Sequence, residues 1–142
     1  MAISETLSEV KAVSQSEEPK IGEYYSREEI SRMFGGSSWT YLPRDRGNVV
    51  SGCFRADLNP KAPEEILVGY GKLRVSSARR LVEQNTPIPI FIQRASAQWE
   101  FIGYYRGKKY SESPSDIMPR AKAANREGQV AGVLYLEAAE DV

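Results

Sequence analysis

Aromatic residues carry the clearest chemical signal in this 142-residue sequence. Trp39 and Tyr41 are two positions apart, so in a strand their side chains would share one face. Trp99 and Phe101 have the same spacing in a second aromatic segment. The ordinary place for such rings is the core of the domain. Two aromatic segments nevertheless hold more rings than a small core usually hides, which favours a pocket where some of them stack on a flat or cationic ligand.

Basic residues are interleaved with these rings. Arg44 follows Tyr41, and Arg94 precedes Trp99. Proteins that hold exposed bases combine aromatic stacking with Arg and Lys contacts to phosphate, so the pattern is typical of a nucleic-acid-binding surface. The alternative is that these side chains flank turns and are simply solvated. The interleaved basic residues are Arg44, Arg46, Lys72, Arg74, Arg94, Arg106, Lys108 and Lys109.

The charge of the chain is unevenly distributed, although its formal net charge is zero. Residues 1–30 hold seven acidic and three basic residues, and the last six residues hold three acidic residues. The stretch 31–136 holds 16 basic and 9 acidic residues, a net charge of +7. The middle of the chain is therefore basic between two acidic ends, which indicates a face that binds a polyanion.

Several kinds of catalytic site are excluded by composition. The sequence contains no histidine, and Cys53 is its single cysteine, so Ser-His-Asp and Cys-His triads and most zinc sites are ruled out. No GxxxxGK[ST] phosphate-binding loop occurs. We therefore expect no catalytic residues, no metal site and no cofactor. An enzyme without histidine is an alternative, in which Asp57 or Glu100 would carry the catalysis.

The order of the expected strands and helices, which must position these residues, predicts one α+β domain over residues 21–138. We expect a small curved mixed sheet or open barrel of five or six strands, with two or three short helices. Strands and helices do not alternate regularly, which argues against a doubly wound sheet. The acidic, polar residues 1–20 are expected to form a disordered tail, and residues 139–142 an acidic C-terminal end.

The best-defined local element is a helix over residues 26–34. Ser26 and Glu29 fit a capping box at its start, and Gly35-Gly36 fits its end. Residues 37–42 are expected to form a strand or an ordered loop. We expect further strands at 49–55, 66–69, 88–94, 99–106 and 129–136, helices at 77–84 and 119–126, and turns at 43–48 and 107–108.

The predicted environment is a reducing one. No apolar run approaches the ~20 residues that a membrane helix needs. The acidic N-terminus does not resemble a signal peptide. A lone cysteine cannot form an internal disulfide, so a cytoplasmic location without membrane association is expected.

The order of five segments resembles a known group of domains. These segments are Tyr25–Ile30, Gly35–Ser37, Asn59–Pro63, Ile88–Ile92 and Trp99–Arg106. They are similar to PUA-like reader domains, the group of SRA and EVE domains found with restriction endonucleases and restriction-linked helicases. The resemblance spans about residues 22–136. It implies a small curved, barrel-like sheet with helices at its ends and an aromatic pocket that accepts a flipped, modified base.

The resemblance also implies roles for individual residues. Base flipping costs a few kcal/mol of unstacking, which stacking and hydrogen bonds in a pocket must offset. The expected stacking residues are Trp39, Tyr41, Trp99 and Tyr104, and Ser38 and Asn59 are expected to read a base edge. The expected phosphate-binding residues are Arg44, Arg46, Arg94, Arg106 and Lys108.

The predicted function is thus a nucleic-acid reader, with DNA favoured over RNA as the ligand. No nuclease or helicase segment accompanies the domain in this sequence, so cleavage would have to come from a partner protein. The alternative is a protein-interaction module, such as an inhibitor or immunity-type small protein, with no nucleic-acid ligand. The acidic ends are compatible with that alternative.

Overall fold

The computed structural model describes residues 18–139. The expected tail over residues 1–20 and the acidic end over 139–142 fall almost entirely outside these residues. The helices are α2 (Arg27–Phe34), α3 (Lys72–Gln84) and α4 (Pro114–Ala123). The strands are β1 (Tyr24–Tyr25), β2 (Arg44–Asp45), β3 (Asn48–Val49), β4 (Gly52–Arg55), β5 (Glu65–Gly69), β6 (Ile88–Ala95), β7 (Gln98–Ser111) and β8 (Val130–Ala138).

Six of the strands form one mixed sheet, with the order β4-β6-β7-β8-β5 and β1 beside β7. The β4–β6 pair is parallel, and the other pairs of this sheet are antiparallel. The outer strands β4 and β5 do not pair with each other, so the curved sheet stays open. The predicted α+β class, with a mixed open sheet and short helices, is therefore confirmed. Within residues 18–139, no helix is long and apolar enough to cross a membrane.

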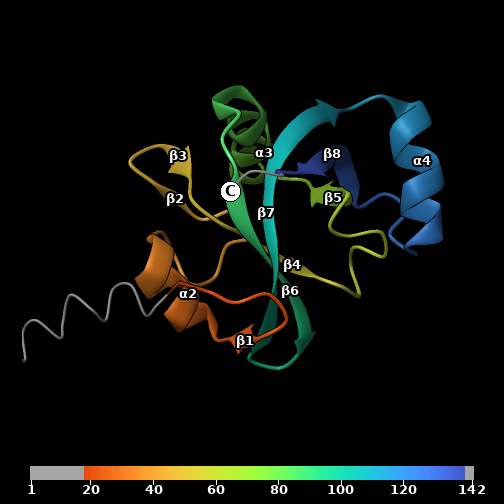
Figure 1. Ribbon diagram of the computed structural model, residues 1–142. Coiled ribbons are helices and arrows are strands. Elements are labelled where there is room, and N and C mark those ends of the chain that lie inside the picture. The colour runs from red at the N-terminus through yellow and green to blue at the C-terminus, as the bar shows by residue number, and fades with distance from the viewer. Residues whose placement is uncertain (1–17, 140–142) are drawn as a thin grey trace, which may run out of the picture.

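Strand β7 runs through the middle of the molecule (Figure 1). Its first half pairs with β6 and β1, and its second half pairs with β8. The prediction of a turn at 107–108 was wrong, because the strand continues through Gly107 to Ser111. A Cβ at Gly107 would lie 3.1 Å from both the Leu81 side chain and the backbone nitrogen of Val82. The glycine thus allows α3 to pack directly on the strand.

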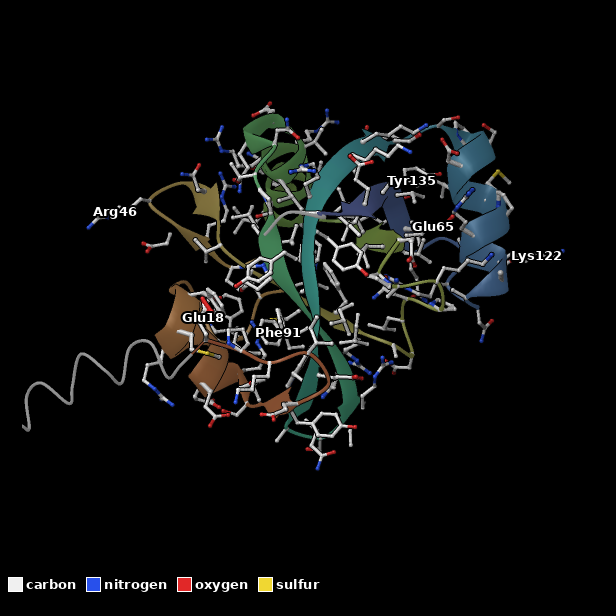
Figure 2. The ribbon with its side chains drawn as sticks, viewed as in Figure 1. Glu18, Arg46, Glu65, Phe91, Lys122 and Tyr135 are labelled. Atoms are coloured by element: carbon white, nitrogen blue, oxygen red, sulfur yellow. The ribbon has the colours of Figure 1, made fainter. Side chains whose placement is uncertain are left out.

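Helix α2 begins with the predicted capping box. The backbone N–H of Glu29 donates to Ser26 Oγ at 3.1 Å, and the backbone N–H of Ser26 donates to Glu29 Oε1 at 2.8 Å. The helix buries Ile30 in a cluster with Phe91 of β6, whose ring lies 6.2 Å from that of Phe34. Figure 2 shows Phe91 in the interior beside β7. This cluster fixes α2 to one face of the sheet.

The opposite face of β6 packs against α3. Ile90 and Ile92 alternate with Phe91 and belong to a second cluster that includes Ala78 and Leu81 of α3. Both faces of β6 are therefore buried, as expected of a strand between helical layers. Pro89 is the second residue of β6, which lies between β4 and β7. The proline is tolerated because the register with β4 begins only at Ile90.

Two helices begin earlier than predicted. Helix α3 starts at Lys72, after Gly71 with φ +137°, so Ser77 is a buried interior residue and not the expected cap. Helix α4 starts at Pro114, and Pro119 lies inside it. Residues 37–42 form a loop, and the expected strand at 49–55 is divided into β3 and β4. The predicted turn at 43–48 is a β2–β3 hairpin.

Candidate nucleic-acid interface

An open cavity of about 750 Å³ lies among the loop before β2, strands β4 and β5, and the start of α3. We call it the Trp39 pocket. It brings together four of the six predicted ligand-binding residues, namely Trp39, Tyr41, Asn59 and Trp99. Its size is within the range of roughly 300–1,000 Å³ that is usual for small-molecule sites. A single nucleotide can therefore be accommodated.

Of the four aromatic residues that line the pocket, Phe54 is buried, and the three that were predicted to stack are not equivalent. Trp39 is 78% exposed, so the face of its indole is open to a ligand. Tyr41 is anchored, because its hydroxyl donates to the backbone oxygen of Arg74 and its ring packs 6.3 Å from that of Phe54. Trp99 is only 8% exposed, and the Arg27 guanidinium lies 5.2 Å from its ring centroid. Trp39 is thus the aromatic side chain best placed to stack on a base.

Asn59 supports the pocket wall with its side chain. Its Oδ1 accepts from the Leu67 backbone N–H at 2.8 Å, and its Nδ2 donates to the Arg55 backbone oxygen at 3.0 Å. These two bonds tie the loop after β4 to β5. The amide that was expected to read a base edge is therefore already engaged with backbone groups, although the residue does line the pocket.

The pocket is strongly basic. Among residues 18–139, no acidic residue belongs to its lining. Arg55 pairs with the exposed Asp57 at 2.7 Å, but the other four cations form no ion pair with a carboxylate of residues 18–139. The lining cations are Arg27, Arg55, Lys72, Arg74 and Arg126.

Arg126 reaches the pocket from the turn after α4. Its Nη1 donates to the backbone oxygens of Leu58 and Leu67 at 2.9 and 3.2 Å. Burial, and then the charge of Arg74, lowers the pKa of Arg126. The Nε atoms of Arg126 and Arg27 are buried without a hydrogen-bond partner. Because both Nε atoms are enclosed by protein, the groups that these two arginines can offer to a ligand are their terminal N–H groups.

The predicted phosphate-binding residues lie elsewhere. Arg44 lines a neighbouring groove of about 400 Å³, the Arg44 groove, together with Lys72, Arg79 and Arg80. Lys72 also lines the Trp39 pocket, so the two depressions share one border. Arg46 projects from the tip of the β2–β3 hairpin (Figure 2). Arg94 pairs with Glu100 at 2.7 Å, and Arg106 and Lys108 lie on the second half of β7.

Two predicted ligand-binding residues are outside the Trp39 pocket. Ser38 lies in the loop next to Trp39 but does not line the cavity. Tyr104 packs edge-on against Phe101, with ring centroids 5.6 Å apart, and lines a separate depression with Phe34. The register between β6 and β7 shifts between the pairs Ile90–Gly103 and Phe91–Phe101, and Tyr104 packs against the same cluster as Phe101.

The two carboxylates of the enzyme alternative are both paired with arginine. Hydrogen bonding from Arg55 holds the pKa of Asp57 below its usual range. Glu100 is bonded to Arg94 Nε at 2.7 Å. A carboxylate held in its charged form is a poor general acid. Between residues 18 and 139, no group of three or more acidic or cysteine side chains could hold a metal ion.

Cys53 at the base of the pocket is expected to be almost unreactive in the folded protein. Burial raises the pKa of its thiol to about 11. Because each pKa unit lowers the thiolate fraction about tenfold, alkylation by iodoacetamide at pH 8 should be at least about 100-fold slower than in urea-unfolded protein. Mass spectrometry of timed samples measures both rates. Similar rates in the two states would show that the pocket floor is open to the reagent.

The fold is shared with solved SRA domains. The SUVH5 SRA domain in complex with methylated CHH DNA gives a TM-score of 0.57 at 14% sequence identity, over 86% of this chain and 90% of that chain. The same domain with fully hydroxymethylated CG DNA gives the same values. With hemi-methylated CG DNA the TM-score is 0.55 at 10% identity, over 85% of this chain and 89% of that one. The predicted resemblance to SRA domains is thus confirmed for the fold.

Neither family models nor curated proteins match the sequence. The similarity is therefore one of backbone fold. The roles of the residues that line the pocket have to be inferred from the chemistry of their side chains.

Proposed function

We propose that this chain is a DNA-binding reader module that takes one unstacked nucleotide into the Trp39 pocket. The observation that carries the proposal is the exposed indole of Trp39 at a cavity whose lining, in the part of the chain that the structure describes, includes five cations and no acidic residue. Stacking on an open aromatic face and contacts from Arg and Lys to phosphate are the two ways in which proteins hold unpaired bases.

The fold supports this assignment. SRA domains of the same fold, those of SUVH5, were solved with methylated and hydroxymethylated DNA. The Arg44 groove extends the basic surface beyond Lys72, which gives the flanking DNA backbone a place to bind. A base that leaves the duplex costs a few kcal/mol of stacking and pairing, and stacking on Trp39 offsets part of that cost.

The first test is the salt dependence of binding to a short DNA duplex. If Arg27, Lys72, Arg74 and Arg126 neutralise four phosphate charges, the slope of log K against log salt should be about −3.6, which corresponds to about a 150-fold loss of affinity between 50 and 200 mM salt. Fluorescence anisotropy with a labelled duplex measures the slope.

The result that overturns the proposal is equally clear. A chain that binds no duplex at 50 mM salt, whether the cytosines are unmodified, methylated or hydroxymethylated, is not a DNA reader. The protein-interaction module would then be the better explanation. The preference for DNA over RNA and the expected nuclease or helicase partner stay predictions.

A further inference from the structure

The side chains of the Trp39 pocket offer more hydrogen-bond donors than acceptors. The hydroxyl of Thr40 is bonded to Ser37 Oγ at 2.7 Å, and Oδ1 of Asn59 accepts from the Leu67 N–H. The Tyr41 hydroxyl donates to a backbone oxygen. Each of these side-chain oxygens in the described lining already makes one hydrogen bond and keeps only its remaining lone pairs, while the five cations of the lining offer only N–H groups.

This polarity leaves one group of a neutral cytosine without its usual partner. The exocyclic amino group of cytosine is a donor, and the side chains that usually recognise it are the carboxylates of Asp and Glu. Among the described residues, neither type lines the Trp39 pocket, whose donors can pair only with the acceptors of the base. A methyl group on the base would add apolar surface without using any of the available donors. The ligand that matches the pocket therefore has strong acceptors.

Two of the donors converge at Gly69. A Cβ at this position would lie 3.9 Å from Arg74 Nε and 3.9 Å from Arg126 Nη2. The absence of a side chain at Gly69 leaves open the space that both guanidinium groups border. At Gly71 a Cβ would lie 3.2 Å from Arg74 Nη1. Gly69 thus leaves room for a small group beside two positive charges, whereas the space beside Gly71 is already occupied by the Arg74 guanidinium.

Several features around this space favour an anion. The two guanidinium groups repel each other, and no carboxylate among the described residues pairs with either of them. Nε of Arg126 is enclosed by protein, but its Nη2 borders this space and forms no hydrogen bond with the described residues. Helix α3 starts here with no side-chain cap at Gly71 and no acidic residue in its first turn. An oxyanion would relieve the repulsion and accept from these groups, and Arg is well suited to bind it with two hydrogen bonds.

We propose that the pocket selects a nucleotide that carries an oxyanion, held between Arg74 and Arg126 beside Gly69, in preference to a neutral methylated base. The proposal rests on the proposed function and specifies the class of nucleotide that the module reads. The oxyanion has two possible sources, a carboxylate attached to the base and a phosphate at the end of a strand. Both present the same acceptors to the two arginines.

The test compares DNA duplexes of one sequence by anisotropy at fixed salt. One contains unmodified cytosine, one 5-methylcytosine and one 5-carboxylcytosine, and a fourth is unmodified but has a 5′-terminal phosphate. Because hydrogen bonds to charged groups contribute about 1.5–3 kcal/mol, the carboxylated or the phosphorylated duplex should bind about tenfold or more tightly than the unmodified one. The duplex that gains affinity identifies the source of the oxyanion.

A pair of arginines on the same helix provides the variant and its control. Arg74→Gln should abolish the preference for the oxyanion while the protein stays folded, because Arg74 is exposed and its only side-chain hydrogen bond in the described residues is to the Tyr70 backbone oxygen. Arg79→Gln removes a cation of α3 that pairs with Glu112 at 3.0 Å outside the Trp39 pocket. It should weaken binding to all four duplexes equally and leave their ratios unchanged.

The outcomes separate this inference from the proposed function. Equal affinity for all four duplexes, or tightest binding to 5-methylcytosine, overturns the oxyanion preference and leaves the DNA reader intact. Loss of the preference in Arg79→Gln as well as in Arg74→Gln also overturns it, because the effect would then be one of overall charge. No binding to any of the duplexes overturns the reader itself.

Discussion

Replacing Trp39 by alanine is expected to lower the affinity for DNA by about ten- to a hundredfold, because stacking of one base on an aromatic side chain contributes about 1–3 kcal/mol. The free energy of unfolding should hardly change, because the indole is 78% exposed and has little packing to lose. Anisotropy with a labelled duplex and urea denaturation measure the two quantities on the same preparation.

The matched control is Tyr24→Ala. Tyr24 is a 53% exposed aromatic residue on β1 and does not line the pocket, so its loss should leave DNA affinity within about twofold. Trp39→Phe should retain most of the affinity, since a flat ring remains. Equal losses in Trp39→Ala and Tyr24→Ala would contradict a specific stacking role for Trp39.

The largest effect on stability is expected at Phe91. This side chain is fully buried, and its ring contacts those of Tyr25, Phe34 and Phe101 at centroid distances of 5.9, 6.2 and 5.2 Å. Phe91→Ala should therefore lower the free energy of unfolding by about 3–5 kcal/mol. Urea denaturation followed by the fluorescence of Trp99, which belongs to the same cluster, measures the change.

Phe91→Leu provides the comparison at this site. It removes the ring but keeps much of the volume, so it should cost less than alanine does. A loss below about 1 kcal/mol for Phe91→Ala would mean that α2 is not fixed to the sheet through this cluster.

The helices and strands that could be predicted are those whose sequence signals lie within a few neighbouring residues. Helix α2 was recognisable from the reciprocal pair Ser26 and Glu29, and β6 from its unbroken apolar run. The errors occurred where a distant contact decides the conformation. Gly107 suggests a turn, yet it continues β7 because α3 packs against its backbone. Pro119 suggests a helix start, yet α4 already begins at Pro114.

Only the aromatic residues of the candidate site could be predicted from the sequence. The aromatic residues Trp39, Tyr41 and Trp99 do meet at one cavity, as their abundance indicated. The cations that line the cavity were not among the predicted phosphate-binding residues. Arg27 and Arg126 are far apart in the sequence, so no local pattern connects them. Lys72 and Arg74 offered a local signal, since both follow Tyr70 and begin α3 after a glycine. Their convergence with Arg126 depends on tertiary structure.

The pairing of strands around β7 has a consequence for how the chain folds during its synthesis. Strand β1 pairs with β7, β4 with β6 and β5 with β8, so every early strand of the six-stranded sheet has its partner in the second half of the chain. The pocket also takes Trp99 and Arg126 from that half. Non-local pairing of this kind folds slowly compared with helical bundles. The Trp39 pocket of a nascent chain is therefore incomplete until the residues through Arg126 have left the ribosome, and it then forms together with the sheet.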